Sequence, residues 1–322
     1  MGNRLGVVLL AWVTVLGAGA FAAAADGPPP PWAFAVNPPG GQPVPDDGTI
    51  RHVPNSSVSF TLTQIRDLFN VPDWHPDNHT AMPPIVAQGR RPDVFACGYC
   101  HLPNGLGRPE NSSLAGLSAD YIVQQVADFK SGVRKSAEPA SLPVNLMIAV
   151  AKSATEAEVR TAAEYFSSLK RTPWIRVVEA DTVPKTRVAG WMLVAVDDGT
   201  TEAIGQRIIE MPENLERTEL RDSASGFIAY VPVGSVAKGE ALINGGDGKT
   251  IQCAVCHGAG LRGLGPVPGL AGRSPSYIVR QLYDMKHGLR HGQWTQLMKA
   301  VVARLTEEDM VAIAAYTASL AP

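Results

Sequence analysis

What this 322-residue sequence lacks excludes several classes of protein. Four cysteines are too few to hold a chain of this length as a disulfide scaffold, so their chemistry must be local. Its 28 lysines and arginines do not outnumber its 30 aspartates and glutamates, and a formal charge of -2 gives no basic surface for nucleic acid. Beyond the N-terminus no apolar run is long enough to cross a bilayer. We therefore expect a globular protein of about two domains that binds no nucleic acid.

The one long apolar run predicts export. Arg4 precedes an apolar stretch over residues 5–25, which ends in small residues at Ala23 and Ala25. A charged start, an apolar centre and an Ala-x-Ala end are typical of a secretory signal peptide, and an uncleaved membrane anchor is the alternative. We predict cleavage near Ala25 and a mature protein in the periplasm.

Composition and an internal repeat divide the chain. Residues 114–125 match residues 270–281 at an offset of 156, and Thr155 matches Thr306 at an offset of 151. Helical spacing and capping residues in both copies predict a mainly α fold. The predicted division is a signal peptide (1–25), a Pro/Gly-rich extended arm with a short helix near residues 62–70 (26–83), a first helical domain (84–172), a small β-containing insert (173–235) and a second helical domain (236–322).

Each copy carries a C-x-x-C-H motif, and the two motifs use every cysteine of the chain. They are Cys97, Cys100 and His101 in the first copy, and Cys253, Cys256 and His257 in the second. This is the attachment motif for c-type haem, in which the cysteines form thioethers and the histidine is the proximal iron ligand. A four-cysteine zinc site usually has about 15 to 20 residues between its pairs, whereas 152 residues lie between Cys100 and Cys253. A thioredoxin-like dithiol would need a βαβ context. We predict two covalently bound c-type haems.

The repeat also selects the sixth iron ligands. Met147 and Met298 are equivalent at the 151 offset, and each lies eight residues before the threonine that begins the last helix. Met285 and Met310 match apolar residues and are predicted to pack in helices. The predicted metal ligands are therefore His101 with Met147, and His257 with Met298. A replacement ligand from the other histidines is the alternative.

Those other histidines are expected to have ordinary roles. His75 and His79 are spaced for one helix face, but Pro76 argues against a regular helix there, so we predict surface or packing roles. His287 and His291 are predicted to be solvated.

The C-x-x-C-H motifs, the Leu-Ala-Gly and Tyr-Ile-Val-x-Gln segments, the equivalent methionines and the final helices resemble class I cytochrome c. The tandem arrangement resembles the dihaem cytochrome c4 family. The resemblance implies a haem held between an early helix, near Gly89 or Gly239, and the last helix. It also implies a proline carbonyl that orients the proximal imidazole. Pro268 fits in the second copy, whereas the first copy departs from the pattern, with Ser112 at the equivalent position and Pro109 the nearest proline.

A six-coordinate His/Met iron has no vacant position for a substrate, which favours one-electron relay and predicts no catalytic residues. The expected donor is a dehydrogenase or a quinol-oxidising complex, and the expected acceptor a terminal oxidase or reductase; association with the membrane would then occur through these partners. Two alternatives stay open. One is a dihaem oxidoreductase with one catalytic haem, of the peroxidase or thiosulfate dehydrogenase type, and the other is the cytochrome subunit of a larger dehydrogenase. The arm and the insert are expected to govern partner choice rather than haem properties.

Overall fold

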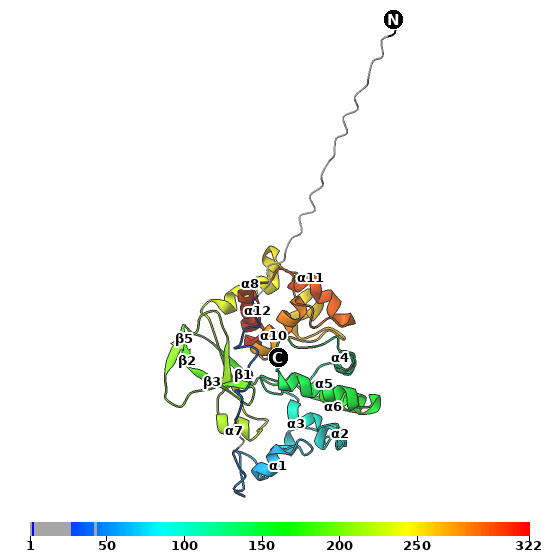
Figure 1. Ribbon diagram of the computed structural model, residues 1–322, viewed down its shortest axis with the longest axis vertical. Coiled ribbons are helices and arrows are strands. Elements are labelled where there is room, and N and C mark those ends of the chain that lie inside the picture. The colour runs from blue at the N-terminus through cyan, green and yellow to red at the C-terminus, as the bar shows by residue number, and fades with distance from the viewer. Residues whose placement is uncertain (1, 3–26, 42–43) are drawn as a thin grey trace.

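The computed structural model describes residues 2, 27–41 and 44–322. The predicted signal peptide therefore lies outside the described residues, apart from residue 2. In the described part the chain is mainly helical, with a small β region at one end of the molecule (Figure 1). No helix in these ranges is long and apolar enough to cross a membrane.

The first copy is built from five helices, whose ends follow the predicted capping residues. Ser118 accepts a hydrogen bond from the Tyr121 amide at the start of α4, and Thr155 forms a capping box with Glu158 at the start of α6. The helices are α2 (Pro84–Ala87), α3 (Cys97–His101), α4 (Ala119–Ser131), α5 (Leu142–Ser153) and α6 (Glu156–Ser168). α4 and α6 pack around a core that includes Ile122 and Phe166. The short helix α1 (Leu62–Arg66) precedes them.

The second copy repeats this arrangement. Ser274 caps one helix, and Thr306 forms a capping box with Asp309 at the start of the last. Its helices are α8 (Ser235–Gly245), α9 (Ala254–His257), α10 (Pro275–Lys286), α11 (Met298–Val302) and α12 (Glu307–Ser319). α8, α10 and α12 enclose a core that includes Leu242, Ile278 and Ile313.

The early helices of the two copies differ, which corrects the expectation for Gly89. Gly239 lies where α8 crosses α12, and a Cβ there would be 2.0 Å from the Ala312 carbonyl oxygen. Gly89 instead lies in a turn after the four-residue helix α2, with φ +65°. Two prolines begin α2 and a left-handed glycine follows it, so the first copy has no long early helix to cross the last one.

The insert is a β region, as predicted, with more strands than the sequence indicated. Its main sheet has the order β1 (Ile175–Glu179), β7 (Phe227–Val231), β6 (Ile209–Pro212), in which β1 and β7 are parallel and β6 and β7 antiparallel. Two small ribbons complete it: β2 (Thr182–Pro184) with β5 (Thr201–Ala203), and β3 (Thr186–Ala189) with β4 (Met192–Ala195). The short helix α7 (Leu215–Glu219) lies between β6 and β7. The sequence shows three β-type runs, at residues 174–178, 187–196 and 227–233. It therefore missed β2, β5 and β6 and merged β3 with β4, because such short strands show too little alternation.

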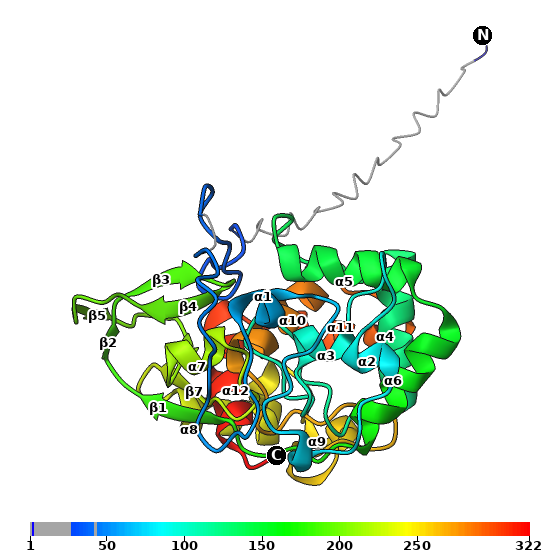
Figure 2. The same ribbon diagram turned by 90° about the horizontal axis from the view of Figure 1, so that it is seen from below.

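The N-terminal arm is not the extended tether that its prolines suggested. Ala33 and Phe34 are only 1% and 5% exposed and belong to the core of the second copy. Arg280 of α10 donates a hydrogen bond to the Ala33 carbonyl at 2.7 Å, and the Tyr283 hydroxyl donates to the Gly27 carbonyl at 3.0 Å. Prolines prevent regular structure but leave carbonyl acceptors and apolar surface, which α10 binds. Figure 2 shows the β ribbons and α4 to α6 on opposite sides of the molecule, with α10 and α12 between them.

Candidate haem sites

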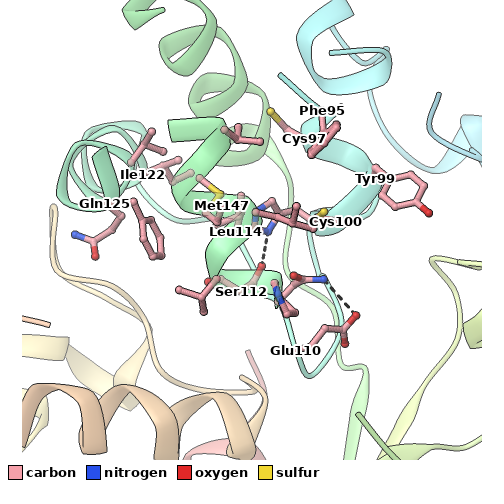
Figure 3. A pocket seen from close by; sticks show the side chains of 18 of the residues that line it. Phe95, Cys97, Tyr99, Cys100, Glu110, Ser112, Leu114, Ile122, Gln125 and Met147 are labelled. Atoms are coloured by element: carbon pink, nitrogen blue, oxygen red, sulfur yellow. Dashed lines mark hydrogen bonds between the residues drawn. The ribbon is translucent and has the colours of Figure 1, made fainter. Parts of the chain in front are cut away.

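The first C-x-x-C-H motif lies in the wall of a cavity of about 440 Å³. Helix α3 contributes Cys97, Cys100 and His101 to this wall, and α5 contributes Met147. Figure 3 shows Met147 across the cavity from the segment that carries the two cysteines. The structure thus brings together the four predicted residues of the first site, although 46 positions separate His101 from Met147. A cavity of this size, lined largely by apolar side chains, suits a buried organic group.

Both histidines of the C-x-x-C-H motifs are oriented by a backbone carbonyl. Nδ1 of His101 lies 2.8 Å from the Ser112 carbonyl oxygen, and Nδ1 of His257 lies 2.8 Å from the Pro268 carbonyl oxygen. A carbonyl oxygen only accepts, so Nδ1 carries the proton in each ring and the Nε2 lone pair is left for a metal. Burial lowers the pKa of His101 to about 4 and also lowers the pKa of His257, so both rings are neutral near pH 7. Ser112 orients the histidine as well as a proline would, because the hydrogen bond uses only the backbone carbonyl. Pro109 is therefore not needed to orient His101.

The cysteines are not built for thiol redox chemistry. All four are free, and burial raises the pKa of Cys97 to about 12 and that of Cys253 to about 11. Reactive dithiols depend on a lowered pKa. A zinc site is equally unsupported, because the described ranges hold no cluster of three or more Cys, His, Asp or Glu side chains that could bind a metal ion.

The second site has a more open wall. Cys253 and Met298 are partly buried and pack against the same hydrophobic core, and His257 at the end of α9 is buried. Cys256 is exposed. Met298 begins α11, whereas its equivalent Met147 lies inside the longer helix α5.

The other histidines take structural positions, with one correction. His75 is buried with Nε2 2.8 Å from Asp222 Oδ1. His79 Nε2 lies 3.1 Å from Asp73 Oδ1, so the two histidines face different partners, which confirms the prediction of packing roles. His287 is not solvated as expected, since its ring stacks on Tyr283 at 3.9 Å between centroids. His291 is exposed, as expected.

Sequence reasoning missed a buried polar network between the two copies. Arg134 donates to Tyr277 at 3.0 Å and to Gln281 at 3.1 Å, and Arg290 donates to Tyr121 and to Gln125, both at 2.8 Å. Each of these residues has an equivalent in the other copy at the offset of 156. The internal repeat was therefore the feature of the sequence that could have revealed the network. Although burial opposes it, the charges of Arg134 and Arg290 lower the pKa of Tyr277 to about 8.

Side chains of this network give the first cavity a charge that suits a haem. Arg134, Gln125 and Tyr277 line the cavity that holds the first C-x-x-C-H motif. Arg290 is 6% exposed, and its Nε atom has no hydrogen-bond partner in the described ranges. Buried guanidinium groups favour a carboxylate partner, which the two propionates of a haem provide.

The insert also reaches the first cavity, although it lies outside both repeats and was expected to govern partner choice rather than haem properties. Trp191, between β3 and β4, and Arg221, just after α7, both line it. No period or motif of the sequence links the insert to the haem motif, and only the folded chain brings them together.

Comparisons with known proteins agree with this chemistry. The family model described as Cytochrome c matches residues 236–321. Cytochrome c-554(548) of Halomonas halodenitrificans is 36% identical over 75 residues, which cover 23% of this chain and 90% of that protein. Cytochrome c4 of Azotobacter vinelandii is 25% identical over 258 residues, covering 75% of this chain and 91% of the relative. The thiosulfate dehydrogenase electron acceptor of Thiomonas intermedia is 27% identical over 234 residues, which cover 71% of this chain and 80% of that protein.

Proposed function

Because the chain belongs to the cytochrome c family and is a cytochrome c4-like electron-transfer protein with covalently bound c-type haems, we propose that it relays single electrons in the periplasm. The donor is a dehydrogenase or a quinol-oxidising complex, and the acceptor is a terminal oxidase or reductase. A dehydrogenase as donor is supported by the thiosulfate dehydrogenase electron acceptors among its relatives. The apolar N-terminal run supports export.

We assign one haem to each copy, within residues 84–172 and 236–322. Cys97 and Cys100 bind the first haem covalently, and Cys253 and Cys256 bind the second. His101 and His257 are the proximal iron ligands, with Met147 and Met298 as the sixth ligands. The observation that carries the proposal is the shared cavity of Cys97, Cys100, His101 and Met147.

The chain's own residues would supply orientation, burial and charge. The carbonyls of Ser112 and Pro268 hold the imidazoles in the tautomer that presents Nε2 to iron. Haem iron supplies the one-electron Fe(III)/Fe(II) couple, and a thioether ligand raises its potential relative to a second histidine. Arg134, which is buried and lines the first cavity, is a cation available to bind a propionate. No acid or base is needed for electron relay, so none is assigned.

Haem content tests the assignment. The exported chain should have the mass of the cleaved polypeptide plus two haems, and both should resist acidic acetone, because thioether bonds are covalent. Cys97→Ala and Cys256→Ala should each impair attachment in their own copy. Their matched control is Ser167→Ala on α6, a partly buried side chain that does not line the first cavity. A chain with fewer than two haems would refute the proposal.

Ligand-resolved spectra decide between relay and catalysis. Two Met-ligated irons should each give a Met-to-iron charge-transfer band. A haem without this band, with an exchangeable ligand, would favour the alternative of a dihaem oxidoreductase. Co-purification in a fixed ratio with a dehydrogenase polypeptide would favour the alternative of a cytochrome subunit.

A further inference from the structure

The two haem-attachment motifs differ sharply in how they are covered. Tyr99 and Val255 are equivalent at the offset of 156, each lying just before the second cysteine of its motif. Tyr99 is 6% exposed, whereas Val255 is 64% exposed. The motif of the second copy therefore faces the surface, and that of the first is covered by other parts of the chain.

The cover over Tyr99 is an arginine of the insert. The guanidinium carbon of Arg221 lies 3.7 Å from the centroid of the Tyr99 ring, and Nη1 donates a hydrogen bond to the Tyr99 carbonyl at 2.7 Å. Arg221 thus contacts both the side chain and the backbone of a residue inside the C-x-x-C-H motif. Stacking on the ring and donation to the carbonyl use the planar geometry that distinguishes arginine from lysine.

The loop that carries Arg221 is held from several directions. Arg221 has φ +59°, a conformation that a non-glycine residue adopts at a cost. The Trp74 indole donates to the Leu220 carbonyl at 2.7 Å, and Arg108 donates to the Thr218 carbonyl at 3.2 Å. The next residue, Asp222, is fixed by His75 at 2.8 Å. These contacts from distant segments place the guanidinium at one position.

The carboxylates around Arg221 are engaged by other side chains. Arg108, which also lines the cavity, forms an ion pair with Glu110, and Asp222 is engaged by His75 and Arg217. Within the described ranges Arg221 forms no ion pair, and it lines the same cavity as Cys100 and His101.

We propose that Arg221 positions the first haem-attachment motif and raises the reduction potential of the first haem above the value that its axial ligands alone would give. This inference rests on the proposed haem attachment at Cys97, Cys100 and His101. Reduction adds one electron, supplied by the redox partner or by the second haem, and lowers the charge of the site by one without breaking a bond. A fixed cation stabilises the less positive, reduced state.

The test is a potentiometric titration of the holoprotein, after mass spectrometry has shown two haems. Arg221→Gln removes the charge but keeps a donor for the Tyr99 carbonyl, and Arg221→Lys keeps the charge. The matched control is Arg187→Gln, which removes the same charge from an exposed position of β3 in the insert. We expect Arg221→Gln to shift the reduction equilibrium of the first haem about tenfold towards the oxidised form, which is about 59 mV for a one-electron couple. The second haem should be unchanged, and Arg221→Lys and Arg187→Gln should stay near the wild-type values.

Two results would overturn the proposal. One is an unchanged first-haem potential in Arg221→Gln with both haems bound, and the other is an equal shift in Arg187→Gln. If Arg221→Gln fails to attach the first haem, Arg221→Met provides a second uncharged side chain of similar length. Loss of the first haem in both, with retention in Arg221→Lys, would show that the residue is needed only for attachment and would also overturn the tuning. A wild-type chain without two haems would instead refute the proposed function.

Discussion

Arg134 and Arg290 pair across an isolated antiparallel bridge that joins the two copies. The Lys135 amide donates to the Leu289 carbonyl at 2.8 Å, and the His291 amide donates to the Val133 carbonyl at 2.9 Å. At the offset of 156, Lys135 is equivalent to His291 and Val133 to Leu289. The two hydrogen bonds are therefore equivalent to each other, and the interface has approximate twofold symmetry. The two copies are therefore joined by a defined contact.

Arg290→Met should weaken this contact. The variant loses three hydrogen bonds from a buried charged group. The Tyr121 hydroxyl loses this donor, and the amide oxygens of Gln125 and Gln281 keep only the hydrogen bonds from Arg134. We expect a loss of about 2 to 4 kcal/mol in the free energy of unfolding, measured by guanidinium titration of the holoprotein. Lys135→Met is the matched control, because Lys135 is exposed and joins the bridge only through its backbone. Equal unfolding midpoints for the two variants would contradict the assigned role of the network.

Gly239→Ala should destabilise the second copy. Its Cβ would lie 2.0 Å from the Ala312 carbonyl oxygen, so α8 must move away from α12. We expect a cost of about 1 to 3 kcal/mol, seen as a lower thermal midpoint of the second copy. Gly245→Ala on the same helix is the control, because no atom lies within 4 Å of its Cβ position. It should be neutral or slightly stabilising, and a similar loss in both variants would show that the crossing is not the cause.

The first turn of α12 should make stability depend on pH. Asp309 is buried, and despite the opposing effect of burial, hydrogen bonds from Thr306, Lys249 and Lys238 lower its pKa from 3.8 to about 2. A carboxyl with a lowered folded pKa contributes stability that is present above about pH 4 and is lost as the pH falls towards 2. Relative to Asp309→Asn, the wild type should be more stable by about 1 to 2 kcal/mol at pH 6, and this difference should shrink towards pH 2. Glu307→Gln, an exposed change in the same turn, is the control, and a pH-independent difference for Asp309→Asn would contradict the prediction.

Replacing either axial methionine should affect one haem. Met147→Ala and Met298→Ala should each abolish one Met-to-iron charge-transfer band and lower the potential of that haem, because a thioether ligand favours Fe(II). Met285→Ala, on α10 against the second core, is the control and should leave both bands intact. If Met298→Ala leaves the spectrum unchanged while a His287 or His291 variant alters it, the ligand of the second haem is wrongly assigned.

The sequence by itself determined what depends on neighbours along the chain. Cysteine spacing established the haem chemistry, and the capping residues Ser118, Thr155, Ser274 and Thr306 marked helix starts that the structure confirms. Such features are visible in sequence because a cap or a C-x-x-C-H motif is complete within a few residues. The internal repeat also singled out Met147 and Met298 as the predicted sixth ligands, because they occupy equivalent positions in the two copies.

Only the tertiary structure decided the contacts between distant segments. The prolines of the arm gave no sign that Ala33 and Phe34 complete the core of the second copy. Nothing in the local sequence of the insert showed that Arg221 stacks on Tyr99, 122 positions earlier in the chain. Burial, charge pairing and the carbonyl that orients a histidine depend on which surfaces meet after folding. The residue type alone does not predict such contacts. Ser112 and Pro268 have different side chains, but each orients a histidine through its backbone carbonyl oxygen.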